Sequence, residues 1–226
     1  MSRSYLYRTF PCPPPGFVDA LPMLKKLTSL FVAIAAVAMS VSAAEIEEGF
    51  VPLFDGKTLD GWKANNNADD FSIEDGAIKA NGDCTHLFYV GEVNGAKFKD
   101  FELRLDVMTR KNSNGGFFIH SAWQDNGWPS GYEVQINNTQ GDPLKSGSLY
   151  KVVDNLEPFE DDTWMQYVIR VEKGMVKVSI NGKELVDHKT EEGSTKLLPD
   201  GGAFSIQAHD KGSTTLHKNI RVKVLE

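Results

Sequence analysis

The sequence predicts an all-β domain in which two antiparallel sheets pack as a sandwich. From Glu45 onward the apolar residues recur almost entirely with a period of two, and no window shows a helical repeat. Turn-forming pairs such as Asp75-Gly76 and Lys173-Gly174 interrupt the apolar runs. About a dozen short strands in one domain, without an internal repeat or a linker, are typical of an antiparallel sandwich.

The individual strands follow from this alternation in chain order. Residues 101–107 alternate strictly between apolar and polar side chains, and residues 167–171, 175–180 and 220–225 repeat the pattern. Asn181-Gly182 follows one of these runs, so we expect a tight hairpin there. Three further runs with the apolar content of interior strands carry polar side chains on one face, namely 114–120, 131–137 and 204–209. We expect these strands to form a concanavalin-like jelly roll.

The first 44 residues have the features of an export signal. Two lysines at 25 and 26 precede an apolar stretch, residues 27–41, and small residues follow it at 42–44. This order is typical of a secretory signal peptide, it fits a buried core helix less well, and the stretch is short for a membrane span. We expect residues 23–44 to be removed on export to the periplasm or the extracellular space. The mature domain, 45–226, would then have no stable membrane insertion. Residues 1–22 stand in front of the signal, so we expect translation to start at Met23.

The mature chain is acidic. Residues 1–44 contain four basic residues and one acidic residue, which leaves 20 basic against 30 acidic residues in 45–226. A net charge of about −10 without a cluster of Lys or Arg argues against nucleic acid or an anionic membrane as a partner. The sequence carries no signal for a particular oligomeric state.

Polar and ionisable side chains share one face of the three unusual strands. Alternate residues of a strand point the same way, so residues 133, 135 and 137 share a face, as do 205, 207 and 209, and 118 and 120. Aromatic residues occur next to these runs in the sequence, namely Trp123, Trp128 and Tyr132, and we expect them to border the polar surface. Sugars require planar hydrogen-bond partners and an aromatic platform, so the surface predicts a carbohydrate ligand.

A series of short motifs runs from residue 53 to residue 221. They are LFDGKTLDGW at 53–62, NGGFFI at 114–119, GYEVQI at 131–136, GSLY at 147–150, the strand at Trp164, NG at 181–182, QAH at 207–209 and NIR at 219–221. In order and spacing this series resembles the 3-keto-disaccharide hydrolase family, over essentially all of 50–226. One departure is His120, which stands where that family usually has an arginine. The resemblance implies a concanavalin-like jelly roll.

The resemblance also implies cleavage of a glycoside that carries a ketone at C3. Such a ketone acidifies the proton on C2, so that a base removes it, hydrogen-bond donors hold the enolate, and the aglycone leaves C1 with the help of an acid. Water then adds to the product. The route requires no pair of opposed carboxylates. The sequence agrees, since Glu133 is the one well-placed carboxylate of the polar face.

Glu133 and His209 are the candidate catalytic residues. Glu133 lies between apolar neighbours, where an unpaired carboxylate has a raised pKa, as a base near neutral pH requires. The alternative is an ion pair across the sheet. His209 is a candidate general acid or base, and its alternatives are a metal ligand and a structural histidine. Which of the two takes the C2 proton stays open.

The candidate substrate-binding residues are amides, aromatic residues and a few charged or polar groups. They are Asn114, His120, Trp123, Trp128, Tyr132, Gln135, Tyr150, Lys151 and Gln207. The amides would bind sugar hydroxyls or the keto oxygen, unless they only tie loops together. The two tryptophans flank Asp125-Asn126-Gly127, which favours an exposed lid over simple loop packing. Tyr150 and Lys151 follow the loop 141–143 and would cap the pocket.

The sequence requires no cofactor. His120, Glu133 and His209 could converge on a metal, but no His-x-His or His-Glu-x-x-His spacing supports zinc. A divalent ion such as calcium stays open at the Asp- and Asn-rich loop 65–70, which lacks an EF-hand pattern. Two functions from different classes therefore remain, an exported enzyme acting on 3-keto-glycosides and a noncatalytic carbohydrate-binding module. A conventional glycosidase is a third.

Overall fold

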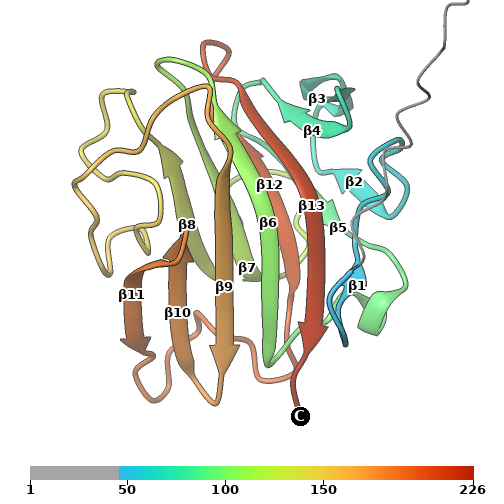
Figure 1. The fold of residues 1–226 in the computed structure, drawn as a ribbon. Coiled ribbons are helices and arrows are strands. Elements are labelled where there is room, and N and C mark those ends of the chain that lie inside the picture. The colour runs from blue at the N-terminus through green and yellow to red at the C-terminus, as the bar shows by residue number, and fades with distance from the viewer. Residues whose placement is uncertain (1–45) are drawn as a thin grey trace, which may run out of the picture. The chain divides into compact units, whose positions relative to one another are not determined.

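Two antiparallel sheets form the body of the protein in the computed structural model, which describes residues 46–226. Figure 1 shows them as two layers, one behind the other. The predicted signal peptide and the predicted start at Met23 lie outside the described residues. Within those residues no helix has the length and apolar character needed to cross a membrane.

The larger sheet has eight strands. Its order is β11 (Lys183–Lys189), β10 (Met175–Ile180), β9 (Met165–Glu172), β6 (Phe101–Thr109), β13 (Thr215–Val224), β4 (Ala77–Ala80) and β3 (Phe71–Glu74), with β1 (Val51–Pro52) paired to β13. The tight hairpin that the sequence predicted at residues 181–182 is present. Asn181 (φ 52°) and Gly182 (φ 79°) join β10 to β11 in the left-handed conformation that a two-residue hairpin turn requires.

The smaller sheet has five strands. Its order is β2 (Trp62–Ala64), β5 (Thr85–Tyr89), β12 (Ala203–Ala208), β7 (Asn114–Ser121) and β8 (Tyr132–Asn137). The only helical turns within 46–226 are two 3-10 segments, η1 (Ala68–Asp70) and η2 (Val93–Ala96). The three polar-faced strands of the sequence are therefore neighbours, β12, β7 and β8, and they carry their polar faces side by side.

The core lies between the two sheets. Period-two alternation turns one face of each strand inward, and the inward residues of both sheets join one buried cluster. The larger sheet contributes Leu103, Leu105, Tyr167, Ile169, Val178 and Val222, and the smaller sheet contributes Leu87, Phe117, Ile119, Val134, Ile136, Phe204 and Ile206. Burial of this apolar area is the main term that stabilises the fold.

The outer faces of the two sheets differ. The larger sheet presents charged residues to solvent, and Glu102, for example, forms ion pairs with Arg104 and Arg170. On the smaller sheet every residue of β5 and β7 is buried, the outward ones included. Aromatic residues of the loop 122–130 cover it, because the Trp123 ring lies 5.2 Å from that of Phe88. The functional site is on this covered face.

Candidate active site

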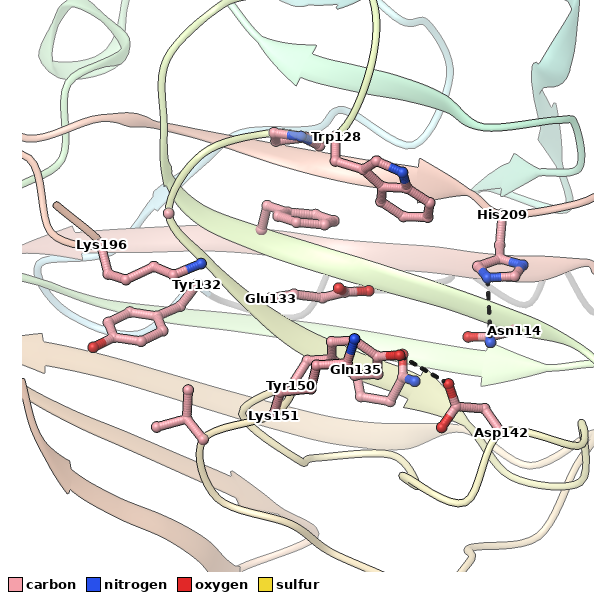
Figure 2. Close-up of a pocket in the computed structure, with 14 residues that line it drawn as sticks. Asn114, Trp128, Tyr132, Glu133, Gln135, Asp142, Tyr150, Lys151, Lys196 and His209 are labelled. Atoms are coloured by element: carbon pink, nitrogen blue, oxygen red, sulfur yellow. Dashed lines mark hydrogen bonds between the residues drawn. The ribbon is translucent and has the colours of Figure 1, made fainter.

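A pocket of about 520 Å³ opens on the outer face of the smaller sheet. Figure 2 shows side chains from β8, β7, the end of β12 and three loops converging on it. The lining residues are Asn114, Phe118, Trp128, Pro129, Gly131, Tyr132, Glu133, Gln135, Asp142, Tyr150, Lys151, Val152, Lys196 and His209. Seven of the nine predicted binding residues and both predicted catalytic residues therefore lie in this pocket or, for Gln207, directly beside it.

Glu133 projects from β8 onto the neighbouring strand β7. Gly116 of β7 makes room for it, because a Cβ atom at Gly116 would lie 2.5 Å from Oε1 of Glu133. Burial raises the pKa of the Glu133 carboxyl to about 7, and the nearby charge of Asp142 adds to this effect. Lys196 and Lys151 act in the opposite direction, but neither forms an ion pair with Glu133 in the described part of the chain. An ion pair across the sheet, the structural alternative for Glu133, is absent from residues 46–226.

His209 follows the last residue of β12 and faces the pocket with Nε2. Its Nδ1 lies 2.8 Å from Oδ2 of Asp210, and Nδ2 of Asn114 lies 3.5 Å from its Nε2. Burial raises the pKa of the Asp210 carboxyl, but hydrogen bonds from His209, Ser213 and the amide of Gly212 lower it below its ordinary value. An ionised Asp210 favours a proton on Nδ1 of His209, and Nε2 is the ring nitrogen that faces the pocket.

Of the three predicted amides, Asn114 and Gln135 line the pocket and Gln207 lies beside it. Gln135 accepts a hydrogen bond from the amide of Ile136 through its own Oε1, at 3.2 Å, which leaves its NH₂ group for a ligand. Oδ1 of Asn114 has no partner within residues 46–226. The amide of Gln207 approaches Glu133 and lowers its pKa, although none of its contacts there has full hydrogen-bond geometry.

Tyrosine and lysine side chains form the far wall of the pocket. The hydroxyl of Tyr150 donates to Oδ2 of Asp142 at 3.0 Å, as the dashed line in Figure 2 shows. Lys151 lies over the Tyr150 ring, at 5.2 Å from its centroid, and Lys196 lies 5.9 Å from the centroid of Tyr132. The positive charges of Lys151 and Lys196 therefore face the pocket, but neither lysine forms an ion pair with the buried carboxylate of Glu133 within residues 46–226.

The two tryptophans have different positions. Trp128 lines the pocket, is 54% exposed, and has its ring centroid 6.1 Å from that of His209. Trp123 does not line the pocket. It packs on Phe88 instead, and Lys63 lies 4.5 Å above its ring. Loop packing, the simpler alternative, describes Trp123 in this structure.

His120 also lies away from the pocket, contrary to the face that strict alternation assigned to it. A β-bulge in β7 adds one residue against β12 and gives His120 a φ of 56°. The side chain therefore turns toward the core, where Nδ1 accepts from the amide of Leu198 at 3.1 Å and Nε2 donates to the carbonyl of Lys99 at 2.9 Å. With both nitrogens bonded within the protein, His120 has a structural position here.

The structure adds four residues that the sequence reasoning missed. Asp142 and Lys196 come from loops, where periodicity carries no information. Asp210 could have been found, because it directly follows His209 and precedes a Gly-Ser pair that bonds it. His86 of β5 is the fourth. It lies directly opposite Gln207 in the register and stacks edge-on with Phe118 at 5.4 Å.

Metal binding has little structural support within the described residues. No group of three or more His, Cys, Asp or Glu side chains in 46–226 could hold a metal ion. In the loop 65–70, Asn67 donates to Oδ1 of Asp70, and Oδ2 of Asp70 accepts from Thr85 at 2.6 Å. These bonds occupy both carboxylate oxygens of Asp70, and calcium at this loop stays a prediction.

Residues 49–223 match the family of 3-keto-alpha-glucoside-1,2-lyase-like domains. The chain belongs to this family. The assignment makes the protein a member of a family of glycosidase-like enzymes, and it confirms the resemblance that the ordered motifs indicated. A relative from Bacteroides thetaiotaomicron, named 3-keto-disaccharide hydrolase, is 26% identical and aligns with 83% of this chain and 85% of its own length.

Solved structures show the same architecture as this member of the 3-keto-alpha-glucoside-1,2-lyase-like family. A protein from Parabacteroides distasonis, described as a "putative glycosyl hydrolase", superposes with a TM-score of 0.63 at 24% identity, over 79% of this chain and 95% of that one. The carbohydrate-binding module CBM66 from Bacillus subtilis superposes with a TM-score of 0.55 at 13% identity, over 72% and 95%. The predicted jelly-roll sandwich is therefore confirmed.

Proposed function

We propose that this protein cleaves 3-keto-glycosides, such as oxidised disaccharides, by removal of the C2 proton, elimination of the aglycone and addition of water. The observation that carries the proposal is the state of Glu133. Its carboxyl is buried, has a pKa of about 7 and lacks an ion pair within the described chain, in a pocket large enough for a sugar. A carboxylate of this kind is a base matched to neutral pH.

Each step has a group in the pocket that suits it. Glu133 takes the proton from C2, and the electron pair moves to the C3 carbonyl oxygen, where the ammonium groups of Lys151 and Lys196 favour negative charge. The enolate then expels the aglycone from C1, and His209 gives the proton on its Nε2 to the departing oxygen and recovers one from the water that adds. Water adds across the new C1–C2 double bond, with OH at C1 and H at C2, so the sum is a hydrolysis.

Comparison of oxidised and unoxidised substrates tests the proposal. The protein should cleave methyl 3-keto-glucoside and leave methyl glucoside intact, because without the C3 carbonyl no carboxylate with a pKa near 7 removes the C2 proton. In D₂O the product should carry deuterium at C2. Product without deuterium, or efficient cleavage of the unoxidised glucoside, would contradict the elimination route.

A substitution isolates the proposed base. Glu133→Gln keeps the shape of the side chain and should lower turnover by roughly 10²- to 10⁴-fold, the usual contribution of general acid–base catalysis. Glu172→Gln is the matched control, because Glu172 is paired with Arg170 on the opposite, solvent-facing sheet. Sugar binding without cleavage of any 3-keto-glycoside would favour the binding-module alternative.

A further inference from the structure

Three buried polar side chains without partners lie together on the outer face of the smaller sheet. His86 of β5 and Gln207 of β12 are directly opposite in the register, and Ser205 lies two residues from Gln207 on the same face. All three have no exposed surface. Within residues 46–226, both ring nitrogens of His86, both amide atoms of Gln207 and Oγ of Ser205 lack a hydrogen-bond partner.

Buried polar atoms without hydrogen-bond partners are unfavourable in a folded protein. A buried donor or acceptor without a partner destabilises the folded state, and native proteins contain few of them. Here three neighbouring residues on one face of the sheet, next to the pocket, have buried polar atoms without a hydrogen-bond partner within residues 46–226. Burial also lowers the pKa of His86 to about 4, so its ring is neutral at pH 7. A neutral imidazole offers one donor and one acceptor, the combination that a sugar hydroxyl complements.

Trp128 lies over these groups. Its ring centroid is 5.6 Å from that of His86, and the same ring lines the pocket beside His209. In Figure 2 Trp128 lies along the edge of the pocket above the strands of the sheet. Phe118, which also lines the pocket, lies 5.4 Å from the His86 ring. On its pocket side His86 is thus bordered by two aromatic side chains, of which only Trp128 is on a loop.

The loop that carries Trp128, residues 122–130, is bonded mainly to itself. Trp123 Nε1 donates to Asp125 at 3.1 Å, and Gln124 donates to the carbonyl of Trp128. At its base, Ser130 Oγ accepts from the amide of Ala122 at 3.0 Å. Within the described chain only aromatic and cation–π contacts hold the tip of the loop on the sheet. One hydrogen bond joins the base of the loop to another element, from Oγ of Ser121 at the end of β7 to the carbonyl of Ser130 at 3.0 Å. The tip of the loop, which carries Trp123 and Trp128, can therefore lift without breaking a hydrogen bond to another element within residues 46–226.

We propose that the loop 122–130 covers a second sugar subsite, in which His86, Ser205 and Gln207 bind the hydroxyls of a ring joined to the one beside Glu133. This inference rests on the proposed function to the extent that the ligand is a sugar. When Trp128 lifts, the pocket extends across β12 to β5. A ligand of two rings then reaches His86 and Ser205, which a one-ring ligand beside Glu133 does not reach. The same Trp128 ring then offers an apolar face to the sugar.

His86→Phe tests the subsite, because it keeps the aromatic packing and removes both nitrogens. The matched control is His217→Phe, since His217 is another fully buried histidine with an unpartnered Nδ1, but it lies on β13 of the larger sheet. Calorimetry would compare an unoxidised glucose disaccharide with methyl glucoside on each protein. Ser205→Ala is a smaller change in the same subsite, for the case in which His86→Phe does not fold.

The expected result is selective. His86→Phe should weaken the disaccharide about tenfold, the effect of roughly one lost hydrogen bond, and leave methyl glucoside within about twofold. It should also unfold no earlier than the wild type, because it removes two unsatisfied polar atoms. Equal effects on both sugars, no effect on the disaccharide, or no binding of it by the wild type would overturn the subsite. Cleavage of methyl 3-keto-glucoside, a one-ring substrate, judges the proposed function separately.

Discussion

Two glutamates of this protein show that environment decides the chemistry of a carboxylate. Burial raises the pKa of both, but Glu102 receives hydrogen bonds from Arg104 and Arg170, which bring its pKa below the ordinary value. Glu133 has Gln207 and two more distant lysines instead, so burial dominates and its pKa rises to about 7. Glu102 is therefore an ionised member of a structural ion pair on the solvent-facing sheet. Glu133 instead has a pKa at which it can exchange a proton near neutral pH.

The raised pKa of Glu133 predicts how stability depends on pH. Between its ordinary value of 4.5 and about 7 the folded protein keeps a proton that the unfolded chain releases. Stability therefore falls as the pH rises through this window, by on the order of 3 kcal/mol from this residue. Glu133→Gln removes the loss, so the variant should gain stability relative to the wild type from about pH 4.5 to 7.

Urea unfolding of both proteins across this range measures the difference in unfolding free energy. A constant difference at every pH would show that Glu133 titrates normally. The activity of the wild type should rise through the same window, because only the ionised carboxylate accepts the C2 proton.

At the scale of the elements, two local features of β7 determine which side chains reach the pocket. Gly116 leaves the space into which the Glu133 carboxylate extends from β8. Four residues later the β-bulge turns His120 toward the core. The strand β7 therefore leaves space for the Glu133 side chain near its start, and near its end it turns His120 away from the pocket.

Gly116→Ala should reduce turnover while the protein still folds. The new Cβ atom would meet Oε1 of Glu133 at 2.5 Å, and the flexible end of that side chain must move away. We expect a loss of at least about tenfold in kcat, because a misplaced base loses its alignment with C2. Gly141→Ala is the matched control, since a Cβ there meets nothing within 4 Å. Steady-state kinetics and thermal unfolding of the two variants test this, and unchanged kcat in Gly116→Ala would show that the carboxylate acts from another position.

At the scale of the whole molecule, the two sheets differ in what covers their outer faces. The larger sheet faces solvent with ion pairs such as Glu102 with Arg170 and shields one side of the core. The smaller sheet is covered on both faces, and its outer cover is made of loops, which form the pocket walls. Loops tolerate variation in sequence better than strands do, so ligand preference can change here without changing the core.

The order of basic, apolar and small residues at 25–44 predicts that the functional molecule is shorter than the encoded chain. We expect the protein recovered from the periplasm or the medium to begin near Glu45, because signal peptidase cleaves after small residues. Intact mass spectrometry of the native protein measures this directly. A mass that includes residues 1–44 would refute export by this signal.

The sequence by itself determined the sandwich, the strands and the polar face of β8, β12 and β7. Period-two alternation is a local property of an extended chain. It places Glu133 with Gln135 on one side of their strand, and Ser205 with Gln207 on one side of theirs, wherever the two strands lie. The family resemblance rested on the order of motifs and was equally independent of packing. Only the tertiary structure decided the exclusion of His120, the approach of Asp142 and Lys196, and the position of His86 under Trp128. A bulge, a loop path and a strand order depend on contacts between residues far apart in the chain, and alternation along one strand cannot specify them.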